Sequence, residues 1–489
     1  MLELKSIDLN KEKTATLVIP VCEDKAIHDY DAIPSLIKKA KKIKEFAGHA
    51  DEELTLYNPS GVKAERVVFL GLGKLETFSA EMLRSFSGRA VKKCIRQRFS
   101  EMLIAVPSEK KVKTDISTLM TSLLEGACLG NHLFDKYKKE KKHNPLKRIG
   151  FLVKPDDAKA FKNLPKKVET VCGGTILARE WVSMPPNDKR PEQFTKTIVG
   201  NAEKAGLKID VLAEKDLKRK KFGAMLAVAA GSDSKPSLVV LEHKPKKAKK
   251  TVALVGKGVT FDSGGINLKP ADGLDGMKMD MSGAAAVAAT LISAAKLRLP
   301  IRVIGFLPIV ENMPSGNATR PGDIVRSYES KTVEIGNTDA EGRLILIDAM
   351  AYAIEQYQPD ILIDLATLTG ACIVALGEKI AGVFSLDKEL ADDIVESGEI
   401  VFERCWRMPM PDDYKELLKS DFADIKNISN TRWGGAITAA LFLAEFVKDT
   451  RWAHIDIAGP AYLKKADSYC GVGGTGFGVR LLCDLLEKL

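Results

Sequence analysis

The sequence contains no long hydrophobic run, and this absence argues against a membrane-spanning helix. No window supplies the roughly 20 uninterrupted apolar residues that a membrane-spanning helix needs. The first residues, MLELKSIDLNKEKT, carry charges where a secretory signal needs an apolar segment. We therefore expect a cytoplasmic protein that makes no contact with a membrane.

The sequence also lacks the common cysteine and histidine motifs of disulfide and zinc sites. The eight cysteines form no Cys-x-x-Cys pair, so reduced and mostly buried thiols fit them best. The six histidines include no His-Glu-x-x-His motif, which excludes the common helix-borne zinc site of metallopeptidases. His454 lies in an alternating segment, Trp452 to Ile457, and is predicted to be a sheet residue rather than a metal ligand.

Length and composition indicate a large globular protein with two domains. The 489 residues exceed the roughly 250–300 at which a single hydrophobic core tends to split. Apolar strands alternate with helical stretches from about residue 14 to residue 152, which predicts a smaller N-terminal α/β domain, residues 1–164. Residues 165–489 are predicted to form a larger C-terminal α/β domain, with a central mixed sheet flanked by helices.

The most informative segment is the octapeptide NTDAEGRL, residues 337–344. It places the carboxylates of Asp339 and Glu341 and the guanidinium of Arg343 at alternate positions. The preceding residues, 331–335, alternate like a strand, and apolar residues recur at helical spacing after Leu344. The octapeptide is therefore predicted to lie where a strand turns into a helix, the place where open α/β sheets bind ligands.

Two further aspartates stand at similar positions. Asp262 is on a glycine-rich turn after an apolar strand, residues 251–255, and Asp280 precedes an alanine-rich helix that runs to about Lys296. Two carboxylates two residues apart can converge on a hard cation, and these aspartates would supply further oxygen donors. Each carboxylate could instead be a helix cap or a turn residue, the commonest role of Asp at such positions. The residues alone leave both interpretations open.

The segments VGKGVTFDSGGINLKP, MKMDMSGAAAV, NTDAEGRL and DLATLTGA together resemble the cytosol aminopeptidase family of leucyl aminopeptidases. They stand in family order from about Pro165 to Leu489, and the resemblance is weak before that. It implies that the C-terminal domain is catalytic. The implied activity is that of a cytosolic metalloexopeptidase that releases N-terminal residues, preferentially leucine and other apolar ones, from peptides. It also implies a homohexamer whose active sites face an interior cavity.

The resemblance further implies two divalent metal ions per subunit, Mn²⁺, Zn²⁺ or Mg²⁺, since their ligands are nearly all oxygen. The implied ligands are Lys257, Asp262, Asp280, Asp339 and Glu341. Asp262 and Glu341 would bridge the ions, and Lys257 would bind as the neutral amine, because adjacent dications depress its pKa. Lys269 and Arg343 take the positions of two catalytic residues. A bicarbonate ion held by the planar fork of Arg343 would act as the general base.

For the substrate, the resemblance points to the loop that follows a predicted buried strand, residues 361–365. Thr367, Leu368 and Gly370 of this loop would supply backbone groups and, with Met277, line an apolar pocket for the first side chain. Ordinary core packing is the alternative for Met277. An apolar pocket prefers leucine or methionine to charged residues, although it discriminates a single methylene by only about 1–3 kcal/mol.

The net charge of +9 and the pI near 8.9 raise an alternative function. Lysines crowd in four segments, residues 38–44, 136–148, 215–221 and 244–250. Such clusters can bind DNA through its phosphates, and some members of the resembled family also act as DNA-binding regulators. The clusters lack interleaved aromatic residues and known DNA-binding motifs, so a role as a DNA-binding regulator is the alternative and not the preferred interpretation.

Overall fold

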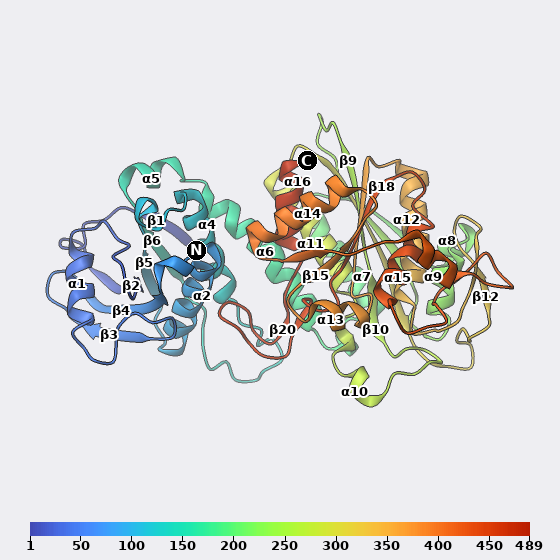
Figure 1. Ribbon diagram of the computed structural model, residues 1–489, viewed down its shortest axis with the longest axis horizontal. Helices are drawn as coiled ribbons and strands as arrows, with labels where there is room; N and C mark the ends of the chain where they lie inside the picture. Colours follow the sequence, from blue (N-terminus) through green and yellow to red (C-terminus); the bar gives the residue numbers. More distant parts are fainter. The chain divides into compact units, whose positions relative to one another are not determined.

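The computed structural model describes residues 1–489, which form two compact units (Figure 1). The N-terminal unit comprises Met1–Cys172 and Lys465–Val472, and the C-terminal unit comprises Gly173–Lys464 and Gly473–Leu489. The predicted boundary at residue 164 is the first residue of helix α6 (Leu164–Ser183). The boundary between the two units lies inside this helix, between Cys172 and Gly173. The inclusion of Lys465–Val472 in the N-terminal unit was not predicted, because no local pattern marks it.

The N-terminal unit contains a six-stranded sheet with the order β1-β6-β5-β2-β4-β3. Its strands are β1 (Leu2–Lys5), β2 (Thr14–Cys22), β3 (Glu53–Tyr57), β4 (Ala64–Gly73), β5 (Glu101–Ala105) and β6 (Arg148–Leu152). All neighbours pair in parallel except the edge strand β3, which is antiparallel to β4. The helices are α1 (Ala32–Ala40), α2 (Ala80–Arg96), α3 (Glu109–Val112), α4 (Ile116–Gly130) and α5 (Pro155–Ala160), with a 3₁₀ turn at Leu75–Thr77.

The C-terminal unit is built on a mixed sheet, as predicted, and this sheet has nine strands. Its order is β16-β15-β18-β14-β9-β11-β8-β7, with β10 paired to β11. The strands are β7 (Lys208–Ala213), β8 (Ser237–His243), β9 (Thr251–Gly256), β10 (Gly258–Asp262), β11 (Arg302–Asn312), β14 (Ile361–Ala366), β15 (Ala381–Phe384), β16 (Cys405–Arg407) and β18 (Arg451–Asp456). The central strands β11, β9, β14 and β18 run in parallel, whereas β8, β7 and β15 pair antiparallel to their inner neighbours.

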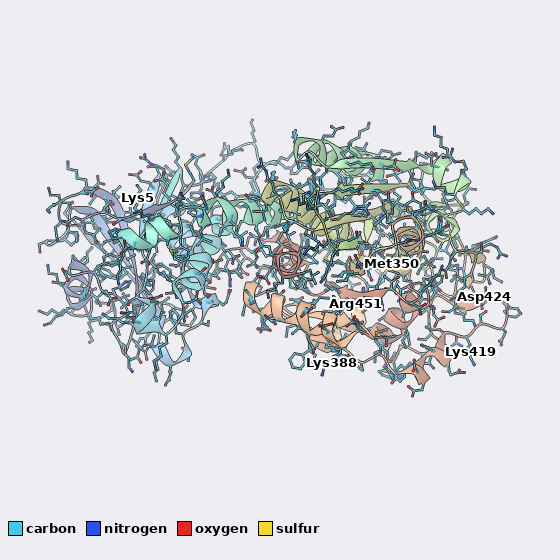
Figure 2. All side chains as sticks on the ribbon, turned by 90° about the horizontal axis from the view of Figure 1, so that it is seen from above. Lys5, Met350, Lys388, Lys419, Asp424 and Arg451 are labelled. Atoms are coloured by element: carbon cyan, nitrogen blue, oxygen red, sulfur yellow. The ribbon has the colours of Figure 1, made fainter.

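Helices cover both faces of this sheet. The helices of this unit are α7 (Pro191–Lys204), α8 (Glu214–Arg219), α9 (Gly223–Ala229), α10 (Ala271–Leu274), α11 (Ser282–Leu297), α12 (Gly342–Tyr357), α13 (Gly370–Leu376), α14 (Lys388–Val401), α15 (Gly435–Ala444) and α16 (Val479–Lys488), with 3₁₀ turns at Pro186–Asp188, Met277–Met279 and Asp412–Leu418. Neighbouring residues of β11 point to opposite faces of the sheet and contact different helices. Phe306 packs with α12, where Met350 is fully buried (Figure 2), whereas Gly305 lies against Leu291 of α11. The two-domain α/β fold class is thereby confirmed.

Two small sheets complete the C-terminal unit. They consist of β12 (Ile324–Arg326), β13 (Thr332–Glu334) and β17 (Ile425–Lys426), and of β19 (Tyr462–Leu463) and β20 (Gly473–Gly474). The octapeptide follows β13 and leads into α12, so it lies between a strand and a helix as predicted. That strand belongs to a small sheet and not to the central one, because alternation shows that a segment is a strand but not which strands it pairs with. No helix in the structure is long and apolar enough to cross a membrane.

Candidate metal centre and active site

Three buried carboxylates from separate segments meet in the C-terminal unit. Asp262 ends β10, Asp280 precedes α11, and Glu341 ends the turn before α12. One carboxylate oxygen of each lies within 4.8 Å of the others. Their exposed fractions are only 2% for Asp262, 4% for Asp280 and 2% for Glu341. The carboxylates therefore converge, as the metal-site hypothesis predicted, and none of them acts as a side-chain cap of α11 or α12.

Two glycines allow this convergence. A Cβ atom on Gly283, at the start of α11, would lie 2.1 Å from the backbone oxygen of Leu365. A Cβ atom on Gly342 would lie 2.5 Å from Cε of Lys257. Any larger residue at either position would push the helix start away from the strand ends. The glycine of each motif is thus required by close packing around the carboxylates.

Lys257 lies between two of the carboxylates. Its Nζ is 2.8 Å from Asp280 Oδ1 and 2.8 Å from Glu341 Oε1, and it donates to the backbone oxygen of Thr367 at 2.9 Å. Burial lowers its pKa, but the charges of Asp280 and Glu341 outweigh burial and hold the pKa above its ordinary value. The two nearby carboxylates therefore favour the charged form of this lysine.

Lys269 joins the remaining two carboxylates. Its Nζ lies 2.8 Å from Asp262 Oδ2 and 2.5 Å from Asp339 Oδ1. Burial lowers its pKa, and the charge of Asp262 together with these contacts raises it above the ordinary value. Asp339 thus reaches the cluster through Lys269, and its side chain is 34% exposed at the edge of the site.

The residues fit divalent cations. Four carboxylates and two ammonium groups leave a formal charge of −2 in a mostly buried site. Asp280 Oδ2 is buried and has no hydrogen-bond partner. Burial is the main cause that raises the pKa values of Asp262, Asp280 and Asp339. Such crowded carboxylates are stabilised by cations, and an oxygen-rich donor set suits hard divalent ions.

Arg343 lies next to the cluster with part of its guanidinium unused. Nη1 donates to the backbone oxygen of Asn427 at 2.7 Å, whereas Nε is buried and has no partner. Burial lowers the pKa of Arg343 to about 10, against the raising effect of Glu341 and Asp456. A buried guanidinium with a free donor is a suitable partner for a planar anion.

All the predicted site residues line one cavity of about 490 Å³. They are Lys257, Asp262, Lys269, Met277, Asp280, Asp339, Glu341, Arg343, Thr367, Leu368 and Gly370. Met277 is only partly buried, so part of its side chain faces the cavity. The volume lies in the range of roughly 300–1,000 Å³ that is usual for small-molecule sites. No histidine lines this cavity.

His454 lies in β18 and is not part of the cavity wall. Its Nδ1 is 2.6 Å from Asp364 Oδ1, and its ring stacks on Phe384. Burial lowers the pKa of His454, and the charge of Asp364 outweighs this effect and raises the pKa above its ordinary value. Asp364 also accepts a hydrogen bond from Trp452 Nε1 at 2.8 Å. The histidine is a paired sheet residue, as predicted.

Sequence reasoning missed two buried residues that hold the site together. Asn427 accepts from the backbone N–H of Gly336 at 2.8 Å and donates to the backbone oxygen of Asn337 at 2.8 Å. Asp456 accepts from Leu368 N at 3.1 Å and from Thr369 Oγ1 at 2.7 Å. They fix the octapeptide and the substrate loop, respectively. The only signal for Asp456 is its position at the end of a predicted strand, and Asn427 has none.

The fold is α/β, and the site holds a buried acidic cluster that could bind metal ions. The chain matches the sequence model of the cytosol aminopeptidase family, catalytic domain, over residues 176–483. It matches the N-terminal domain model of the same family over residues 19–141, where sequence motifs alone indicate little. The chain therefore belongs to the cytosol aminopeptidase family. It is an aminopeptidase, a hydrolase of peptide bonds, from a metal-dependent family.

Individual relatives align with 91% or more of this chain. A probable cytosol aminopeptidase of Chlorobium limicola is 40% identical over 506 residues, which cover 98% of each chain. The corresponding protein of Chlorobaculum tepidum is 44% identical over 459 residues, or 91% of this chain and 90% of the relative. Among solved structures, the bottromycin maturation enzyme BotP in complex with Mn aligns with a TM-score of 0.85 at 32% identity, covering 97% of this chain and 99% of BotP.

Proposed function

We propose that this aminopeptidase removes N-terminal leucine and other apolar residues from peptides at a two-metal centre. The observation that carries the proposal is that one cavity gathers the oxygen-rich cluster, two lysines, Arg343 and the apolar loop. The proposed ligands of Mn²⁺, Zn²⁺ or Mg²⁺ are Lys257, Asp262, Asp280, Asp339 and Glu341. The bound ions would polarise the scissile carbonyl and lower the pKa of the attacking water.

Lys269 is proposed to stabilise charge in the transition state. Its ammonium lies on the cavity wall, close to Asp262 Oδ2 and Asp339 Oδ1. From there it can donate a hydrogen bond to the carbonyl oxygen as that oxygen gains negative charge. Its contacts with Asp262 and Asp339 hold the ammonium in place before the substrate arrives.

Arg343 is proposed to hold a bicarbonate ion that takes the proton from the attacking water. The unpartnered Nε of Arg343 and the absence of histidine from the cavity wall support this role. The bond from Nη1 to Asn427 fixes the plane of the guanidinium, so that its free edge is preorganised for a planar oxyanion. The proton would then pass to the leaving amine.

Recognition of the N-terminal residue is proposed to use both the free amine and the shape of the pocket. A free terminal amine could bind through its nitrogen lone pair to a metal ion held by the cluster, and an acetylated terminus could not. Met277, Thr367, Leu368 and Gly370 would surround the first side chain. Because Asp456 and Asp280 hold the substrate loop by hydrogen bonds, the pocket is largely preformed.

A comparison of leucine p-nitroanilide with its N-acetylated form tests this function. The manganese-loaded protein should hydrolyse the free-amine substrate and leave the acetylated one intact. The anilides of aspartate and lysine should be cleaved more slowly than that of leucine. Hydrolysis of both leucine anilides at similar rates would contradict the assignment of an aminopeptidase site.

Three related properties are proposed from the family alone: location in the cytoplasm, as the name of the relatives suggests, assembly as a homohexamer, and peptides as natural substrates. The mass in solution tests the hexamer. DNA binding remains an alternative additional role. The basic segments are divided between the two units, and Lys218 and Arg219 already pair with Glu214 and Asp216. Absence of duplex DNA retention at low salt would exclude it.

A further inference from the structure

One of the four cationic side chains that line the cavity differs from the others. Lys257 and Lys269 pair with carboxylates, and Arg343 is buried beside Asn427. Arg432 is exposed and forms no ion pair. The cavity therefore offers one positive charge that is engaged neither by the carboxylate cluster nor by the proposed bicarbonate site at Arg343.

Arg432 is held in place by an aromatic ring. Its guanidinium carbon lies 4.2 Å from the ring centroid of Trp433, which is itself 68% exposed. Such cation–π stacking engages the face of the guanidinium and leaves its N–H edges free. The pair thus presents a planar set of donors with reduced side-chain freedom, and it gives the exposed tryptophan a function.

The segment that carries Arg432 is anchored on both sides. Asn427, five residues earlier, is bonded to the octapeptide backbone, and α15 begins at Gly435. Within the segment, Ser429 Oγ donates to the backbone oxygen of Thr431 at 2.8 Å, and Trp433 N donates to Thr431 Oγ1 at 3.3 Å. These contacts fix Arg432 on the cavity wall relative to the carboxylate cluster.

We propose that Arg432 binds the C-terminal carboxylate of short peptide substrates, so that the enzyme favours peptides of two or three residues with a free C-terminus. This inference rests on the proposed function, in which the free amino terminus is held at the metal centre. A short peptide also carries a negative C-terminal carboxylate, and Arg432 offers an unpaired positive charge on the same cavity wall. The planar fork of arginine binds a carboxylate through two parallel hydrogen bonds. A cavity of about 490 Å³ is of a size for such a substrate.

The test compares leucylglycine with leucylglycinamide, which differ only in the C-terminal charge. The quantity measured is the KM of the amide divided by the KM of the free acid, for the full-length, manganese-loaded enzyme. Arg432→Ala should lower this ratio by at least about 10-fold, equivalent to about 1.4 kcal/mol. The loss should arise from a higher KM for leucylglycine, with kcat and the hydrolysis of leucine p-nitroanilide nearly unchanged. Arg432→Lys should restore part of the ratio, because it keeps the charge but not the fork.

Arg404→Ala is the matched control. Arg404 also stacks on an aromatic ring, with its guanidinium 4.8 Å from the centroid of Phe402, but it does not line the cavity. Its removal should leave the ratio unchanged. The inference about Arg432 would be overturned if the KM ratio of an active Arg432→Ala enzyme equalled that of the wild type, or if the ratio fell equally in Arg404→Ala. The proposed function would be unaffected by either result. Failure of the wild type to hydrolyse leucine p-nitroanilide would overturn the proposed function and this inference with it.

Discussion

The Lys257 ammonium lies 2.8 Å from Glu341 Oε1, and both side chains are almost completely buried. The positive charge of Lys257 offsets the negative charge of the Glu341 carboxylate, at the place where the proposed function puts a metal ion. Lysine binds a metal only as the neutral amine, so metal uptake must displace that proton. The pairing therefore links metal binding to proton release.

Metal uptake at pH 8 should accordingly release about one proton per chain from Lys257. Calorimetric titration of the metal-free protein with Mn²⁺, in two buffers of different ionisation enthalpy, measures the number of protons. Lys257→Met, which cannot supply a proton, should reduce that number by about one. Equal heats in both buffers for the wild type would contradict the neutral-amine ligand.

Lys269→Ala separates catalysis from binding. The variant should lower kcat by at least about 100-fold, the scale for one lost oxyanion donor. No other lysine is held by Asp262 and Asp339 at this place, so no other ammonium can replace it. The metal content should stay unchanged. If KM alone rises, Lys269 binds substrate and contributes nothing specific to the transition state.

Added bicarbonate should raise the rate of peptide hydrolysis by enzyme that has been dialysed in degassed, bicarbonate-free buffer. Arg343→Ala should lose this response while keeping its metals, since Arg343 supplies the only guanidinium with a buried free donor on the cavity wall. Arg343→Lys should restore little, because an ammonium lacks the planar fork. Activity that does not depend on bicarbonate would assign the proton transfer to another group.

The Asp364–His454 pair should make stability depend on pH. The pKa of His454 is raised, so its stabilising contribution is complete below the ordinary pKa of 6.5 and is lost as the pH rises through the raised value. Asp364→Asn should destabilise the protein by about 3 kcal/mol at pH 6, as expected for breaking a buried pair, and by less at pH 9. Urea unfolding in the presence of a chelator measures the difference.

A surface ion pair provides the control for that prediction. Arg451, labelled in Figure 2, contacts Asp387, which also caps α14. Asp387→Asn keeps a capping oxygen and removes only an exposed pair, which is expected to contribute under about 1 kcal/mol. A loss for Asp387→Asn as large as that for Asp364→Asn would mean that burial of the His454 pair does not cause the effect.

The parts of the site that could be predicted lie in short motifs. Asp339, Glu341 and Arg343 are within five residues of one another, and Asp262 and Asp280 stand at strand and helix ends that periodicity reveals. Local patterns therefore place these side chains at the edge of a sheet. The cavity that unites them was expected only through the family resemblance.

The parts that could not be predicted depend on contacts between distant segments. Asn427 reaches Asn337 across 90 residues, and Asp456 reaches Leu368 across 88. Arg432 lies in a stretch without periodicity, so nothing in the local sequence indicates that it faces the cavity. The same reason explains why Lys465–Val472 was not assigned to the N-terminal unit and why β13 was not assigned to a small sheet.

Metal content and peptidase activity, measured on the same preparations of wild type, Asp339→Ala and Glu341→Ala, test the central claim most directly. Asp392→Ala, which removes an exposed carboxylate of α14, is the control and should resemble the wild type. The two-metal centre predicts two ions per chain and hydrolysis of leucine p-nitroanilide for the wild type and the control. Both cluster variants should bind fewer ions and lose hydrolysis. Full activity of either cluster variant after treatment with a chelator, without restored metal, would contradict the account.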